Sequence, residues 1–191
     1  GDDTLYGDDG NDVLEGGTGN DSMIGGNGSD RITFGGSSGA VTVNMSAGTA
    51  TGDGNDTFSS IEAFTGSSNS DLFTMTADTF FSFGNVSGGG GAADRVNISN
   101  GGGNLNAISA ANMNSLFDDI DILDMTLATR ASQLNFTTTD IDGMNGTATG
   151  FTLRVASGFS LALDGVAVNT AGPGTQNIAI GSGITVTVEV V

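Results

Sequence analysis

The sequence predicts an all-β chain built as a parallel β-solenoid. Three observations predict this fold: a nine-residue repeat at the N-terminus, a composition rich in turn-forming residues, and later segments in which apolar and polar residues alternate. The 191 residues include 33 glycines and one proline, a pattern typical of turn-dense β proteins. The chain is long enough for one sizeable domain or two small ones.

The repeat occupies residues 1–36. An aspartate returns every nine positions, an apolar residue stands two places after each aspartate, and glycines return in the turns between them. The aspartates are Asp3, Asp12, Asp21 and Asp30, and the apolar residues are Leu5, Leu14, Met23 and Ile32. Because two nonapeptides make one coil, we expect Asp3 and Asp21 to stack on one side of the solenoid, and Asp12 and Asp30 on the other.

The residue types of this repeat favour calcium. Ca²⁺ takes roughly six to eight oxygen ligands from carboxylates and backbone carbonyls, and glycine adopts positive φ without steric cost, so glycine-rich turns can point carbonyls at a common centre. Residues 1–30 hold eight acidic side chains and no basic one. Stacked carboxylates repel one another without a cation. We therefore expect the tract to be disordered without metal, and calcium binding to be coupled to folding.

The turns GGTGND at 16–21 and GGNGSD at 25–30, with the variant GDDGND at 7–12, resemble the repeats-in-toxin (RTX) family. The resemblance implies a calcium-binding parallel β-roll that holds several Ca²⁺ ions. The first repeat is cut off, which suggests that the chain begins inside a longer array. The predicted metal ligands of this region are Asp3, Gly7, Asp9, Gly10, Asp12, Gly16, Gly17, Gly19, Asp21, Gly25, Gly26, Gly28 and Asp30.

Residues 37–103 are interpreted as degenerate repeats with connecting strands. Asp56, Asp71 and Asp94 each precede an apolar residue by two places and are further candidate ligands. The alternative is an Asx-turn, in which the aspartate bonds its own backbone. Residues 40–45 alternate as a strand does, and residues 59–66 resemble a connecting coil in which a strand replaces one calcium turn.

Residues 104–191 are predicted to be a β-rich C-terminal region, either a solenoid continuation or a small sandwich that caps the array. Segments 151–155, 159–163 and 184–190 alternate as strands, and a short helix is expected between 107 and 117. The acids of 118–124 are interpreted as the solvated face of a strand. The final residues are similar to the C-terminal address that type I secretion systems read in RTX proteins.

Composition excludes several functions. The net charge of −18, with four arginines and no lysine, disfavours binding to nucleic acids and to anionic lipids. Without histidine or cysteine the chain has no Ser-His-Asp triad, no thiol nucleophile and no disulfide. No apolar run is long enough to span a bilayer. We expect a protein that is not an enzyme.

The expected function is that of a calcium-binding structural module in a secreted, cell-surface bacterial protein of the surface-layer or adhesin type. It would fold when calcium binds outside the cell. One alternative is the C-terminal secretion and folding module of a type I secreted protease or lipase whose catalytic domain lies upstream of Gly1. Another is an adhesin tip that holds sugar or ice on outward rows of threonine, which the array does not show. Self-association into a surface lattice or filament is a further expectation for a roll with open ends.

Overall fold

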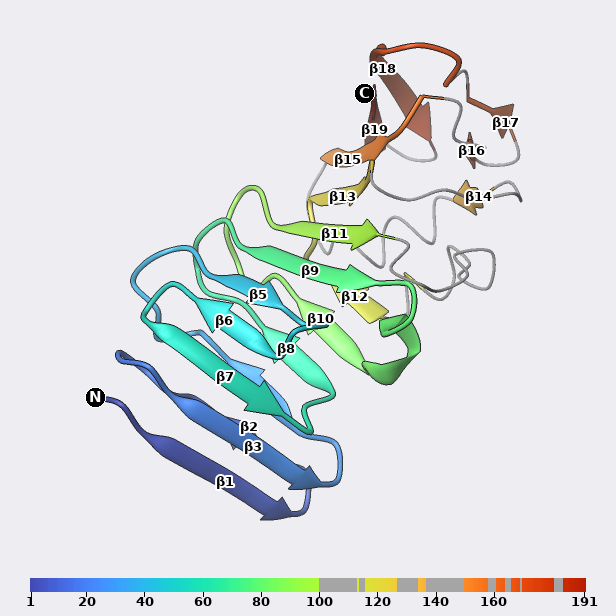
Figure 1. The fold of residues 1–191 in the computed structure, drawn as a ribbon. Helices are drawn as coiled ribbons and strands as arrows, with labels where there is room; N and C mark the ends of the chain where they lie inside the picture. Colours follow the sequence, from blue (N-terminus) through green and yellow to red (C-terminus); the bar gives the residue numbers. More distant parts are fainter. Residues whose placement is uncertain are drawn as a thin grey trace.

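The computed structural model describes residues 1–99, 113, 116–126, 134–136, 150–157, 161–163, 166–168, 170–180 and 184–191. Apart from Met113 and Leu116, which are helical, the regular elements of these residues are β-strands and one three-residue 3-10 helix, η1 (Phe80–Ser82). The strands form broad, mostly parallel sheets that rise from the N-terminus to the C-terminus (Figure 1). The prediction of an all-β fold is confirmed.

The described strands make three sheets. Sheet A has eleven strands in the order β1 (Thr4–Asp9), β3 (Ser22–Asn27), β7 (Asn55–Ser59), β6 (Thr49–Thr51), β5 (Thr42–Asn44), β9 (Leu72–Thr76), β11 (Arg95–Ser99), β13 (Ile122–Met125), β15 (Gly150–Val155), β19 (Ile184–Val190) and β18 (Gly174–Ile180). Sheet B has five, in the order β12 (Phe117–Asp118), β10 (Asn85–Ser87), β8 (Ala63–Thr65), β4 (Arg31–Thr33) and β2 (Val13–Leu14). The third contains β14 (Leu134–Phe136), β16 (Leu161–Leu163) and β17 (Val166–Ala167).

The first two coils have the predicted register. Strand β1 pairs in parallel with β3, and β2 pairs in parallel with β4. The partners are eighteen residues apart, as Thr4 and Ser22 show, so each coil consists of two nonapeptides. Strands β1 and β3 each span six residues, because they extend into the glycine turns that follow.

The apolar column of the repeat is the core of the coils. In sheet A the register places Met23 beside Phe58, and in sheet B it places Ile32 beside Phe64. Met23, Ile32 and Phe64 are fully buried, and each such side chain stabilises the fold by about 1.5–3 kcal/mol. The rings of Phe58 and Phe64 lie 5.1 Å apart and join the two sheets.

An antiparallel hairpin interrupts the parallel order of sheet A. Strands β5 and β6 pair antiparallel with each other, β6 pairs antiparallel with β7, and β5 pairs in parallel with β9. In sheet B, β8 and β10 are direct neighbours. The strand expected at 40–45 is therefore present as β5, but the sequence interpretation did not predict its hairpin partner β6.

The C-terminal strands continue sheet A. Strands β13, β15 and β19 add in parallel, and β18 closes the order by pairing antiparallel with β19. The predicted strands at 151–155 and 184–190 correspond to β15 and β19. The strand expected at 159–163 is described only over β16, and most of the helix expected at 107–117 lies outside the described residues. Because sheet A runs through all three predicted segments, the boundaries at 36 and 103 stay a prediction.

No helix within the described ranges is long and apolar enough to cross a membrane.

Candidate metal centre

The first carboxylate column follows the strands β1, β3 and β7. The backbone amide of Asp3 donates a hydrogen bond to Oδ1 of Asp21 at 2.8 Å, and the amide of Asp21 donates to Oδ1 of Asp56 at 3.0 Å. Neighbouring strands lie about 4.8 Å apart, so the three aspartates stack at this spacing. We call Asp3, Asp21 and Asp56 the β1 column.

The second column lies on the other side of the coils, beside β2, β4 and β8. The amide of Asp12 donates to Oδ1 of Asp30 at 2.8 Å, and the amide of Asp30 donates to Oε2 of Glu62 at 2.9 Å. We call Asp12, Asp30 and Glu62 the β2 column. Sequence interpretation missed Glu62. Its signal is that Glu62 precedes the buried Phe64 by two places, as Asp30 precedes Ile32.

Three carboxylates in these columns are incompletely paired. Oδ2 of Asp12, of Asp21 and of Asp30 is buried and accepts no hydrogen bond from any residue that the structure describes. Burying such an oxygen without a partner costs several kcal/mol. Arg31 does not compensate it, since its guanidinium donates to Thr65 Oγ1 and Asn85 Oδ1. The fold therefore leaves a place for a cation at each of the three.

Glycines face these unpaired oxygens. A Cβ built on Gly16 would collide with Oδ2 of Asp21, and one built on Gly25 would lie 2.6 Å from Oδ2 of Asp30. A Cβ on Gly7 would lie 2.9 Å from Oδ2 of Asp12 and would also collide with the carbonyl oxygen of Gly25. Only glycine leaves room here for a carboxylate oxygen and a carbonyl oxygen from the next turn to converge.

The stacked turns also need glycine for their backbone conformation. Gly28 has φ of 144°, and a Cβ there would collide with the carbonyl oxygen of Gly10 one coil away. Gly19 has φ of 125°, and a Cβ built there would collide with the carbonyl of Gly1. Positive φ also occurs at Gly10, Gly17 and Gly26, but not at the predicted positions Gly7, Gly16 and Gly25.

Two predicted ligands lie on the outside of the coils. Asp9 is exposed, and its Oδ1 accepts a hydrogen bond from Asn27 Nδ2 at 2.8 Å. The side chain of Asp3 is also exposed, although its amide is part of the β1 column. Their roles as ligands stay predictions.

Asp71 is held differently. Its Oδ1 accepts hydrogen bonds from the amide of Val41 at 2.7 Å and from Ser67 Oγ at 2.9 Å, and its Oδ2 accepts one from the amide of Ser67. The carboxylate is 98% buried, since only 2% of the residue's surface is exposed, and both of its oxygens are paired. The turn at 66–71 thus pairs Asp71 through Ser67, four residues earlier, which is not the Asx-turn left open by the sequence, and the role of Asp71 as a metal ligand stays a prediction.

Asp94 continues a third column from Asp71. The amide of Asp71 donates to Oδ1 of Asp94 at 2.7 Å, and the amide of Asp94 donates to Oδ2 of Asp121 at 2.9 Å. Burial raises the pKa of Asp94 to about 7, and the negative charges of Asp71, Asp121 and Asp119 add to this. Burial likewise raises the pKa of Asp56, with Asp21 and Asp53 contributing.

The solvated strand face expected for the acids of 118–124 is wrong in two places. Asp121 accepts the amide of Asp94, as described above, and Asp124 is buried. Asp124 forms an ion pair with Arg154, whose Nε also lies 2.9 Å from Oε2 of Glu189. The cross-strand register of β13, β15 and β19 brings these three side chains together, and no local sequence pattern carries that long-range pairing.

The oxygen sets of the first two columns fit calcium. Among the described residues no three acidic side chains gather at one point. A cation beside either column would therefore take most of its oxygen ligands from the backbone carbonyls of the turns. Ca²⁺ accepts such mixed oxygen sets with flexible geometry. Zinc sites use cysteine and histidine, and the chain has neither.

Comparison with known families agrees with this geometry. Residues 1–37 match the model of the RTX calcium-binding nonapeptide repeat in four copies. Comparisons with curated proteins and with solved structures found no match. RTX nonapeptide repeats bind calcium and are typical of proteins exported by type I secretion. Residues 1–37 of this chain are thus four copies of the RTX calcium-binding nonapeptide repeat.

Proposed function

We propose that this chain is a calcium-dependent folding module of a type I secreted protein, and that it serves a structural role at the cell surface. The observation that supports it best is the set of buried, unpaired oxygens at Asp12, Asp21 and Asp30. Each lies against a glycine whose missing side chain lets the carboxylate oxygen approach the backbone of the turn.

Calcium ions would lie between successive turns of each column. In the β2 column the carboxylates of Asp12 and Asp30 and the carbonyl of Gly25 would hold one. In the β1 column Asp21 and Asp56 would contribute. When bound, calcium supplies positive charge that offsets the negative charge of the stacked carboxylates. The glycines would direct backbone carbonyls toward the ion. Met23, Ile32 and Phe64 form the buried core between the two sheets and exclude water from it.

The same charge arrangement suits export. Through residue 62 the chain carries eleven acidic side chains and one arginine, so in a calcium-poor cytoplasm the columns repel and the array stays unfolded. Outside the cell, calcium in the range of about 10⁻⁴–10⁻³ M typical of extracellular modules would fold it. The paired or column-bound acids explain the carboxylates without any catalytic role, so we propose that the module is not an enzyme.

Calcium titration followed by circular dichroism tests this proposal. The protein in excess EDTA should lack β signal over the array and regain it as calcium is added. Asp21→Asn should raise the calcium midpoint, whereas Asp118→Asn, which changes an exposed carboxylate on β12, should not. A protein that is fully folded in EDTA, or equal midpoints in the two variants, would contradict the proposal.

A further inference from the structure

A row of uncharged polar side chains crosses the outer face of sheet A. The register of β6, β5, β9 and β11 places Thr49, Asn44, Thr74 and Asn97 side by side. Their neighbours along each strand, such as Phe73 and Val96, are buried in the core, so the polar side chains face outward. This row of two threonines and two asparagines is not a regular threonine ladder, but it is an uncharged polar row that begins where the hairpin enters the sheet.

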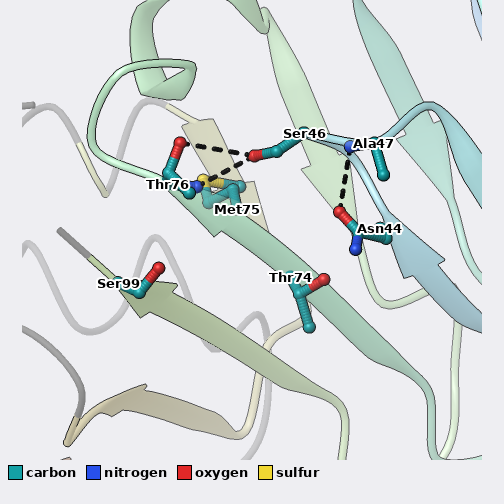
Figure 2. A pocket seen from close by; sticks show the side chains of 7 residues that line it. All are labelled: Asn44, Ser46, Ala47, Thr74, Met75, Thr76 and Ser99. Atoms are coloured by element: carbon teal, nitrogen blue, oxygen red, sulfur yellow. Dashed lines mark hydrogen bonds between the residues drawn. The ribbon is translucent and has the colours of Figure 1, made fainter. Parts of the chain in front are cut away.

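This row borders a hollow at the ends of β5, β9 and β11 (Figure 2). We call it the hairpin hollow; it has a volume of about 370 Å³ and is lined by Asn44, Ser46, Ala47, Thr74, Met75, Thr76 and Ser99. Its volume falls in the range of small-ligand sites, roughly 300–1,000 Å³. No acidic or basic side chain lines it, in a chain of net charge −18.

One wall of the hairpin hollow is fixed by internal hydrogen bonds. Ser46 Oγ accepts the amide of Thr76 at 3.1 Å and lies 2.9 Å from Thr79 Oγ1. Asn44 Oδ1 accepts the amide of Ala47 at 3.0 Å (Figure 2). These bonds tie the β5–β6 turn to β9, so the wall is organised before any ligand arrives.

Other polar atoms around the hairpin hollow have unused hydrogen-bonding capacity. Within the described residues, the side-chain nitrogen Nδ2 of Asn44 and the hydroxyl of Ser99 make no hydrogen bond. The Thr74 hydroxyl has only a 3.4 Å bond to the carbonyl of Val43. Beside Thr74 in the row, Oδ1 of Asn97 is buried and unpaired. The hollow therefore offers both donors and acceptors without net charge.

We propose that the hairpin hollow binds one neutral sugar unit of a polysaccharide. Sugar hydroxyls donate and accept at once, which matches amide and hydroxyl groups that do the same. The exposed Ala47 supplies a small apolar surface for the C–H groups of a ring. An anionic ligand would meet no cation here, and a metal ion would meet no carboxylate.

Affinity electrophoresis of the whole chain in saturating calcium tests the site. The gels contain dextran, laminarin or mannan as neutral probes and alginate as an acidic one. At least one neutral polysaccharide should retard the protein. The double variant Thr74→Val, Ser99→Ala should bind at least about tenfold more weakly, because it removes two hydroxyls and little volume. Thr57→Val is the matched control, since Thr57 is exposed on the same face, on β7, outside the hollow, and it should bind like the unchanged protein.

Several results would overturn the proposal: no retardation by any neutral polysaccharide, retardation by alginate alone, or equal binding by the double variant and the unchanged protein. Inhibition of ice recrystallisation without sugar binding would also overturn it and would assign the row to an ice surface. Calcium midpoints measured on the same variants separate this proposal from the calcium function. Normal calcium-dependent folding without sugar binding would remove the sugar site alone.

Discussion

The turns at 25–30 and 66–71 both bury an aspartate, but they differ in how the oxygens of its carboxylate are paired. Each ends in a fully buried aspartate whose Oδ1 accepts a backbone amide from a stacked neighbour. At Asp30 the second oxygen is left unpaired, whereas at Asp71 the backbone amide of Ser67 donates to the second oxygen and the Ser67 hydroxyl donates to Oδ1. The comparison teaches that the turn at 66–71 pairs both oxygens of its buried carboxylate through Ser67 and Val41, whereas the turn at 25–30 leaves one oxygen open for the proposed cation.

The largest effect should follow calcium removal. Amide hydrogen exchange in EDTA should show that protection is lost through β3 and β4. The reason is that Oδ2 of Asp21 and Oδ2 of Asp30 then have no calcium ion and no other partner. Protection in β9 should persist, since Asp71 keeps the bonds from Val41 and Ser67. Equal loss in both regions would show that serine does not replace the ion.

Replacing Asp21 with alanine should raise the calcium midpoint at least about tenfold, since it removes a ligand and an acceptor for the amide of Asp3. The matched change Asp71→Ala should destabilise the protein while leaving the calcium midpoint within about twofold. Calcium titrations monitored by circular dichroism would measure both. A midpoint that moves with Asp71 as much as with Asp21 would contradict the comparison.

Ser67→Ala should cost about 1–3 kcal/mol of unfolding free energy, because one buried carboxylate oxygen loses its hydroxyl partner. Urea unfolding at saturating calcium measures it, with the exposed Ser70→Ala as control. If the cost disappears as calcium rises further, an ion has entered the turn, and the two turns are interchangeable.

The smallest effect should be a dependence on pH. In the metal-free fold burial raises the pKa of Asp94 from its ordinary 3.8 to about 7, so between these values the native state holds a proton that the unfolded chain has released. The stability of the β9–β11 region in EDTA should therefore fall as pH rises from about 4 to about 7. Asp94→Asn should flatten this dependence in urea unfolding measured across that range. An unchanged slope would show that Asp94 is ionised throughout.

Local repetition allowed the sequence to predict the coils. A nine-residue period determines which aspartates stack and which apolar residues are buried, so the burial of Met23 and Ile32 and the stacking of Asp3 on Asp21 and of Asp12 on Asp30 follow from it directly. Glu62 escaped because it replaces the expected residue type, although it keeps the spacing to Phe64. Ser67 escaped because a serine in a polar turn gives no signal of its own.

Long-range features were not predictable from local pattern. The β5–β6 hairpin depends on pairing with β7 and β9, and the ion pairs of Arg154 depend on the register of three separated strands. From the sequence, the hairpin was therefore interpreted as an ordinary strand, and Asp124, which pairs with Arg154, was interpreted as part of a solvated surface. The C-terminal strands were predicted because the alternation of apolar and polar residues is a local signal. Their order in sheet A depends on pairing between distant segments, which gives no local signal.

The hairpin gives sheet A two strands that sheet B does not have between the same coils. At a spacing of about 4.8 Å per strand, one side of the stack is longer than the other by about 10 Å. The two extra strands should therefore bend the stack at residues 42–51, and this ten-residue segment sets the direction in which the described strands after β9 continue sheet A.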